Sequence, residues 1–317
     1  MRKPVALPDF SIVVPVYNEE ANLATLYAEL KPVAETLPGT WEIVFVDDGS
    51  SDGSFAVLAR LAQEEERVRV VRFVRNFGQT AALVAGFDFS RGQVIFSLDA
   101  DLQNDPRGIA ALLVVMQQGY DLVCGWRRAR QDAWLTRQLP SRAANWLIRR
   151  VAGISLHDVG CTLRAYRRSL VARLRLYGEA HRLLPLYAKL AGARIAEVVV
   201  PHRPRLHGRG KYALGRIPKV LLDLLLFHVL RRYGTRPLHF FGGCGLLVLL
   251  AALVVFVAVL LKPTSWLGAL LLFLVAVALA GNAILLGLLA EGLVRTYYET
   301  RNQPIYHVEK VINPPSE

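Results

Sequence analysis

The sequence predicts an α/β protein: a doubly wound, Rossmann-like parallel sheet followed by an interfacial helix and two transmembrane helices. Three observations support this fold class. Short β-branched runs alternate with helical segments over residues 1–216, as in a parallel sheet with crossover helices. Residues 237–290 are almost entirely apolar. Two carboxylates, Asp99 and Asp101, lie one residue apart where a buried strand should end.

The expected elements follow one another in a regular order. Strands are expected at 10–16, 41–46, 68–74, 94–98 and 198–200. Residues 111–125 are expected to form a helix followed by another strand. Helices are expected between them at 21–37, 54–66 and 79–90. The first strand is not followed by G-x-G-x-x-G, and G-x-x-x-x-G-K-[ST] occurs nowhere in the chain. A bound nucleotide would therefore be held by carboxylates, a metal and basic side chains.

The carboxylate pair predicts a metal site. Residues i and i+2 of an extended segment point the same way, and ligands of open α/β sheets bind beyond the carboxyl ends of the strands. Asp99 and Asp101 could share Mg²⁺ or Mn²⁺, with Gln103 adding an amide oxygen. Such a cation would hold a diphosphate. The alternative is a pair of solvated loop aspartates, with Asp105 capping the next helix.

The charge balance points to anionic partners. The net charge is +12, which suits nucleic acid, an anionic membrane or phosphorylated substrates. Many arginines lie between residues 127 and 236, just before the apolar block. This position favours membrane and phosphate and argues against nucleic acid. The three cysteines are widely spaced in no metal or redox pattern, which predicts reduced thiols.

The C-terminal third predicts a membrane anchor. Residues 217–236 are apolar with a basic end and predict a helix lying on the bilayer. His239–Leu261 has 23 uncharged residues, which as a helix reach roughly 34 Å against a hydrocarbon core of about 30 Å. Trp266–Ala290 is also uncharged. Together they predict a transmembrane hairpin over 237–290.

The distribution of basic residues predicts the orientation of this hairpin. Arginines precede and follow it, and Lys262 is the basic residue in its turn. The positive-inside rule then places the first domain and both termini in the cytoplasm, at the inner membrane. The tail, 291–317, contains an alternating segment that resembles an edge strand and is expected to fold back on the first domain. Ala276 and Ala280 form a small-xxx-small pair that leaves homo-oligomerisation open.

Four motifs taken together resemble a known family. They are Val-Pro-Val-Tyr-Asn-Glu at 14–19, Val-Asp-Asp-Gly-Ser at 46–50, Asp-Ala-Asp at 99–101 and a basic loop at 201–212. Their order and spacing resemble the family 2 glycosyltransferases with the GT-A nucleotide-sugar fold. Within that family the chain is most similar to the polyprenyl-phosphate sugar transferases, the dolichol-phosphate mannose synthase group, over essentially its whole length.

The resemblance implies roles for residues of the donor site. Those expected to contact the nucleotide sugar are Pro15, Tyr17, Glu19, Phe45, Asp47, Asp99, Ala100 and Asp101. The first three would line the base and ribose pocket, and Asp47 would hold the base or ribose with Phe45 beside it. Asp99, Asp101 and Gln103 would bind the metal that bridges the diphosphate. The alternative for Asp47, with Asp48, is a capping turn.

The resemblance also implies basic residues that contact phosphate. Arg127 follows a predicted strand, and Arg137 is a second candidate. Arg205 and Lys211 fall on the charged positions of the family's R-x-x-G-x-S-K loop, where Gly210 replaces the usual serine. That loop would clamp the donor diphosphate and the acceptor phosphate. The alternatives are a solvated helix face or a juxtamembrane patch worth about 1 kcal/mol per charge on an anionic leaflet.

Asp158 is the candidate on the acceptor side. It lies in a segment, 156–166, that matches the acceptor-lining region of these enzymes. Asp158 would act as a base or orient the acceptor. A lipid phosphate is already ionised near neutral pH, so a strong general base is not required.

The function implied is inverting, metal-dependent transfer of one sugar from a nucleotide-diphosphate sugar to polyprenyl phosphate. UDP-glucose is the favoured donor, GDP-mannose the alternative, and undecaprenyl phosphate the expected acceptor in a bacterium. A processive polysaccharide synthase is disfavoured because the chain lacks Q-x-x-R-W. A non-catalytic membrane scaffold would predict a damaged metal site, whereas the acidic pair is present.

Overall fold

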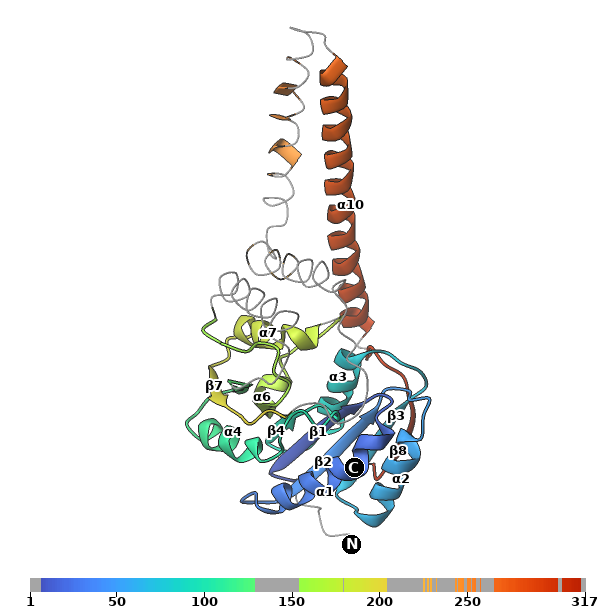
Figure 1. The fold of residues 1–317 in the computed structure, drawn as a ribbon, viewed down its shortest axis with the longest axis vertical. Helices are drawn as coiled ribbons and strands as arrows, with labels where there is room; N and C mark the ends of the chain where they lie inside the picture. Colours follow the sequence, from blue (N-terminus) through green and yellow to red (C-terminus); the bar gives the residue numbers. More distant parts are fainter. Residues whose placement is uncertain are drawn as a thin grey trace. The chain divides into compact units, whose positions relative to one another are not determined.

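The computed structural model describes residues 7–128, 154–178, 180–203, 265–301 and 304–314, with isolated positions between 225 and 257. Its chain forms two compact units, one comprising residues 1–213 and 304–317 and the other residues 214–303. The first unit contains the sheet and the candidate site, and the second contains the long helix α10 (Ser265–Arg301) (Figure 1).

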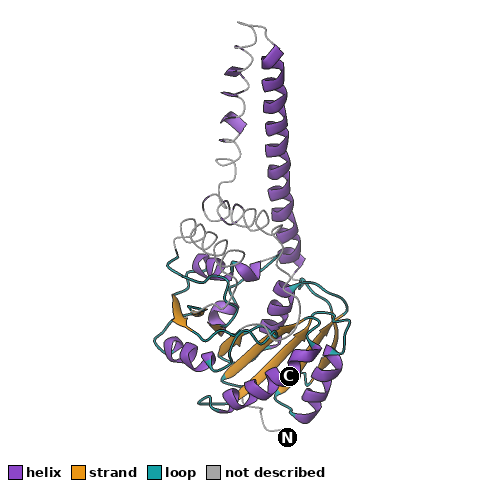
Figure 2. Ribbon diagram, in the orientation of Figure 1, coloured by secondary structure: helices purple, strands orange, loops and turns teal. Residues whose placement is uncertain are grey.

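Within the described residues, the first unit is built on an eight-stranded sheet with the order β7-β5-β6-β4-β1-β2-β3-β8. The strands are β1 (Phe10–Val16), β2 (Trp41–Asp47), β3 (Val68–Phe73), β4 (Val94–Ser97), β5 (Leu122–Trp126), β6 (Arg164–Arg167), β7 (Ile195–Val199) and β8 (Val308–Ile312). Strands β1 to β4 begin and end close to the expected positions. Figure 2 shows them gathered in one twisted sheet with helices in front of it.

The expected all-parallel sheet is only partly right. Strands β4, β1, β2 and β3 pair in parallel, as do β5 and β7. Strand β6 runs antiparallel to both β4 and β5, and β8 runs antiparallel to β3. The regular β–α alternation that predicted parallel pairing ends at β5, and a short strand such as β6 carries no local signal for its direction. The sheet is therefore mixed.

Helices cover both faces of the sheet. They are α1 (Glu20–Glu35), α2 (Ser54–Glu64), α3 (Gln79–Phe89), α4 (Gly108–Met116), α6 (Arg168–Val171), the 3₁₀ turn η2 (Ala180–Arg182) and α7 (Leu184–Leu190). Leucines of α1, α2 and α4, such as Leu26, Leu58 and Leu112, are fully buried in one hydrophobic core against β1 and β2. Helix α3 packs on the opposite face. There Gly86 permits close approach, because a Cβ would collide with Val13.

The C-terminal segment returns to the first unit as an edge strand, which confirms that expectation. Strand β8 pairs with β3. Just before it, the Tyr306 ring stacks on Phe73 with centroids 5.0 Å apart, and its hydroxyl donates to Asp88 Oδ2 at 2.8 Å. The tail thereby covers the edge that β3 would otherwise expose.

The second apolar stretch, expected over Trp266–Ala290, is helical and forms part of α10, which continues to Arg301. Most of the first stretch and all but a few positions of 217–236 lie outside the described residues. Counted over the residues that the structure describes, no helix supplies an apolar segment long enough to cross a membrane. The interfacial helix and the transmembrane hairpin remain predictions.

Candidate active site

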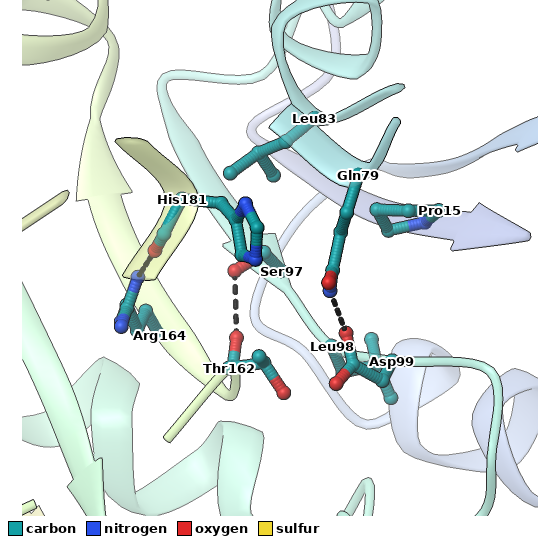
Figure 3. Close-up of a pocket in the computed structure, with 9 residues that line it drawn as sticks. All are labelled: Pro15, Gln79, Leu83, Ser97, Leu98, Asp99, Thr162, Arg164 and His181. Atoms are coloured by element: carbon teal, nitrogen blue, oxygen red, sulfur yellow. Dashed lines mark hydrogen bonds between the residues drawn. The ribbon is translucent and has the colours of Figure 1, made fainter. Parts of the chain in front are cut away.

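A pocket opens where the carboxyl ends of β1 and β4 meet. These strands are parallel neighbours, so the residues that follow them reach the same edge of the sheet. The pocket is lined by Pro15, Gln79, Leu83, Ser97, Leu98, Asp99, Thr162, Arg164 and His181. Figure 3 shows Gln79 and Asp99 on one side of it and Thr162, Arg164 and His181 on the other. Of the residues expected from the sequence, Pro15 and Asp99 line it.

Asp99 is a half-buried carboxylate at the edge of this pocket. Gln79, the first residue of α3, donates from Nε2 to Asp99 Oδ1 at 2.8 Å. Burial, reinforced by the neighbouring charge of Asp101, raises the pKa of Asp99 to about 6, and the guanidinium groups of Arg127 and Arg164 act in the opposite direction. The site thus concentrates negative charge that a cation would relieve.

The chain turns back directly after Asp101. Asp101 is 7% exposed, and its Oδ1 accepts from the Gln103 N–H at 3.2 Å. Leu102 makes the turn with a φ of 61°. Ala100, between the two carboxylates, is buried in the core, and its place at the donor stays a prediction. The described residues contain no cluster of three or more acidic, histidine or cysteine side chains that could hold a metal.

The carboxylates of Asp99 and Asp101 are nevertheless ligands that suit Mg²⁺. Mg²⁺ is commonly held by one or two carboxylates plus substrate phosphates and water. The Asp99 carboxylate is oriented by hydrogen bonds from Gln79, at Oδ1, and from the Thr162 side chain, and Asp101 follows two residues later. The donor set therefore suits a cation that arrives with a diphosphate.

The alternative role of Asp105, capping the following helix, is close to what the structure has. Its Oδ1 accepts from the Arg107 N–H at 3.0 Å just before α4, and its carboxylate pairs with Arg107 and Arg203 at 2.6 and 2.9 Å. These donors lower its pKa to about 2, against the opposing effect of burial. Arg203 also pairs with Glu29 at 2.7 Å. Arg203, the last described residue of the basic loop at 201–212, is therefore anchored near the carboxylate turn.

The loops after β1 and β2 brace each other. Asn18 adopts a φ of 54°, donates its N–H to Ser50 Oγ at 3.0 Å and accepts the Ser51 N–H at 2.8 Å. Tyr17 and Glu19, expected at the nucleotide, are half-buried on either side of it. Both therefore lie on a loop held firmly beside the pocket-lining Pro15.

Asp47 and Asp48 have separate roles in the turn after β2. Asp47 is fully buried; its Oδ1 accepts the Ser50 N–H at 3.1 Å and its Oδ2 lies 3.6 Å from Arg72 Nε. Burial raises its pKa. Phe45, two residues earlier on the same strand, also has no exposed surface and packs in the core. Its place beside the nucleotide stays a prediction.

Asp48 fits the capping alternative. It accepts from the Phe77 N–H at 2.7 Å, from the Gly78 N–H at 3.0 Å and from Asn76 Nδ2 at 3.0 Å. Burial raises its pKa to about 6 despite these donors. The neighbouring Gly49, at a φ of 68°, packs so tightly on the main chain of Arg75 that no side chain would fit. The turn after β2 therefore fixes the loop that leads into α3 and Gln79.

Arg127 and Asp158 bind each other. Arg127 Nε and Nη2 donate to the two carboxylate oxygens of Asp158 at 2.7 and 3.0 Å. Asp158 is 4% exposed and its N–H donates to Glu197 at 2.8 Å. This buried carboxylate is engaged by Arg127 in a bidentate pair, and its role as a base or in orienting the acceptor stays a prediction. It positions Arg127, whose charge acts on Asp99.

Comparison with known proteins assigns the site to a family. The sequence profile of "Glycosyl transferase family 2" matches residues 11–175. The chain belongs to glycosyl transferase family 2. It is therefore a glycosyltransferase, as the motifs predicted.

Two relatives resemble this glycosyltransferase over nearly its full length. A dodecaprenyl-phosphate galacturonate synthase of Rhizobium johnstonii is 37% identical over 99% of this chain and 96% of its own. An undecaprenyl-phosphate 4-deoxy-4-formamido-L-arabinose transferase of Pseudomonas aeruginosa is 39% identical over 98% and 92%.

Among solved structures, glucosyl-3-phosphoglycerate synthase from Mycobacterium tuberculosis shares the fold. Its complex with Mn²⁺, UDP and glucosyl-3-phosphoglycerate is 21% identical, covers 71% of this chain and 80% of its own, and has a TM-score of 0.54. A complex of the same protein with Mg²⁺ and UDP also has a TM-score of 0.54, at 21% identity over 71% and 79%. The GT-A-like α/β architecture expected for this glycosyltransferase is therefore confirmed.

Some expected site residues lie outside the described residues, and others were missed. Arg137, Arg205 and Lys211 belong to the first group. The missed residues Gln79, Thr162, Arg164 and His181 line the pocket of this glycosyltransferase. Gln79 could have been found, because Gly78 in the sequence separates the third strand from the next helix and so places Gln79 at the start of that helix. In the structure Gly78 has a φ of 95° and directly precedes α3. No such signal existed for His181, because its partner Thr80 is 101 positions away.

Proposed function

We propose that this family 2 glycosyltransferase moves one sugar from a UDP-sugar to a polyprenyl phosphate, with undecaprenyl phosphate the expected acceptor in a bacterium. The observation that carries the proposal is Asp99 in the pocket, with Asp101 two residues later acting on its pKa. The chain's full-length relatives are named for transfer to dodecaprenyl and undecaprenyl phosphate. Support for UDP comes from the solved neighbour, which holds UDP with Mn²⁺ or Mg²⁺.

The donor diphosphate would lie against the carboxylate turn. Asp99 and Asp101 would hold Mg²⁺ or Mn²⁺, which offsets the negative charge that grows on the leaving diphosphate. Gln103 stays the proposed third ligand. Pro15, Tyr17, Glu19 and Asp47 line the neighbouring turns where the nucleoside would lie.

The reaction needs little from the protein beyond positioning. An ionised oxygen of the lipid phosphate attacks the anomeric carbon in line, the bond from that carbon to the UDP oxygen breaks, and its electron pair leaves with UDP. The configuration at the anomeric carbon inverts. No proton has to be removed from the nucleophile, which agrees with an Asp158 engaged by Arg127. Arg127, Arg137, Arg205 and Lys211 would neutralise phosphate charge.

We also propose that the enzyme is anchored in the inner membrane by the hairpin over 237–290, with the interfacial helix on the cytoplasmic leaflet. The support is the sequence: two uncharged apolar stretches flanked by arginines. Anchoring places the active site beside its lipid acceptor and replaces a three-dimensional search by positioning at a surface.

The test is transfer of radiolabelled sugar in membranes containing the enzyme. UDP-glucose, UDP-galacturonic acid and GDP-mannose are offered separately with undecaprenyl phosphate, with and without Mn²⁺ or Mg²⁺. Metal-dependent labelling of lipid by a UDP-sugar supports the proposal and names the sugar. Labelling by GDP-mannose alone would replace the donor class. Absence of labelling from every donor, with a folded protein, would favour the membrane scaffold.

A further inference from the structure

His181 contributes an imidazole to the pocket that the proposed reaction does not yet use. It lies in the short turn η2, lines the pocket that contains Asp99 and is half-buried. Figure 3 shows its ring across the pocket from Gln79, with Asp99 beyond. A ligand attached to a diphosphate at Asp99 would extend toward this ring.

The turn that carries His181 is held by buried groups on two other elements. The His181 carbonyl accepts from Arg164 Nη1 at 3.1 Å. Its N–H donates to Thr80 Oγ1 at 3.3 Å, and its ring Nδ1 lies 2.8 Å from the same hydroxyl. Thr80 and Arg164 are each 2% exposed. The backbone of the turn is therefore tied to both α3 and β6, and the ring is held by Thr80 of α3.

The Thr80 hydroxyl can donate to Nδ1 of His181 or accept from it, because that oxygen carries one proton and two lone pairs. In the neutral imidazole the other ring nitrogen, Nε2, is then a donor or an acceptor, respectively. Sugar hydroxyl groups both donate and accept hydrogen bonds, so an imidazole of either tautomer suits a sugar.

We propose that His181 contacts the transferred sugar of the donor and sets part of the sugar specificity, with Thr80 as its positioning residue. The chemical group recognised is an oxygen substituent of a hexosyl unit linked to UDP. Because this inference rests on the proposed function, its test measures donor binding without any lipid acceptor.

The experiment measures binding of UDP, UDP-glucose and UDP-galacturonic acid to the full-length protein in detergent with Mn²⁺, by titration calorimetry. His181→Ala, His181→Gln and Thr80→Val are compared with the native chain. Thr40→Val is the matched control, since its hydroxyl bonds to Asp9 in the exposed turn before β2. Thermal unfolding of each variant is followed in parallel.

The expected result is a loss of affinity for UDP-hexoses with no change in affinity for UDP. His181→Ala weakens binding of at least one UDP-hexose about three- to tenfold, the effect of one hydrogen bond, while UDP binds as before. His181→Gln keeps a hydrogen-bonding side chain and recovers part of the loss. Thr80→Val lowers UDP-hexose affinity alone, and Thr40→Val changes nothing.

Three outcomes would overturn the inference. Equal weakening of UDP and UDP-hexoses would make His181 a structural residue. Unchanged binding of both UDP-hexoses by folded His181→Ala would show that the imidazole makes no contact with the transferred sugar. If the native protein binds UDP-glucose and UDP-galacturonic acid no more tightly than UDP, the sugar adds no affinity and the proposed contact with His181 is refuted. If UDP itself does not bind, the proposed donor is wrong, whereas sugar-dependent binding without lipid labelling would refute only the acceptor.

Discussion

Replacing Gln79 by leucine tests whether the pocket orients Asp99 for a cation. The amide donates to Asp99 Oδ1 at 2.8 Å, and leucine keeps the bulk while removing the donor. A hydrogen bond to a charged group contributes about 1.5–3 kcal/mol, and loss of a group that orients a metal ligand typically costs about 10–100-fold in metal affinity. We therefore expect Gln79→Leu to weaken Mn²⁺ binding by about 10–100-fold.

The assay is Mn²⁺ binding in the presence of UDP, followed by the electron paramagnetic resonance signal of free Mn²⁺. Gln63→Leu, at an exposed position of α2, controls for the loss of an amide and is expected to bind Mn²⁺ normally. Unchanged or tighter Mn²⁺ binding by folded Gln79→Leu would refute the reasoning, since Gln79 would then compete with the cation for Asp99.

Three further predictions concern stability. The folded-state pKa of Asp48, about 6, is raised above its ordinary 3.8. The stabilising contribution of this group is therefore complete below about pH 4 and is lost as the pH rises through 6. In urea unfolding, the free energy of unfolding of the native protein should fall over this range by up to about 3 kcal/mol more than that of Asp48→Asn. Asp158→Ala leaves Arg127 without its bidentate partner and should lower the free energy of unfolding by about 3 kcal/mol in chemical denaturation. The same substitution made in an Arg127→Ala background should lower it by less. Gly86→Val should lower the free energy of unfolding by about 1–3 kcal/mol through overpacking against Val13; a melting temperature equal to that of the native protein would contradict it.

The central part of the fold could be predicted because its signals are local. The strands from Phe10 to Ser97 are short β-branched runs separated by helical segments, and each was expected within a few residues of its observed limits. The Asp99–Asp101 pair marked the ligand edge because it directly follows such a strand. The direction of β6 was not predictable, since it depends on pairing with β4 and β5.

The site was harder to predict where it depends on contacts distant in the chain. The resemblance offered Asp158 as a base or as a residue that orients the acceptor, and it gave no sign of the bidentate pair with Arg127, 31 positions away. The resemblance also placed Phe45 beside the nucleotide, and it did not show that β2 is buried along its whole length. His181 reaches the pocket only because the chain returns to α3. Short sequence motifs do not predict these contacts, because each joins residues that are distant in the chain.

The most direct test of the central account is lipid labelling by the native enzyme and by Asp101→Ala, measured against Mn²⁺ concentration with the active UDP-sugar and undecaprenyl phosphate. The account predicts that native labelling rises with Mn²⁺ and is abolished by a chelator, and that folded Asp101→Ala stays near background at every Mn²⁺ concentration. Native-like labelling by Asp101→Ala, or labelling that persists in the chelator, would contradict the role given to the carboxylate pair.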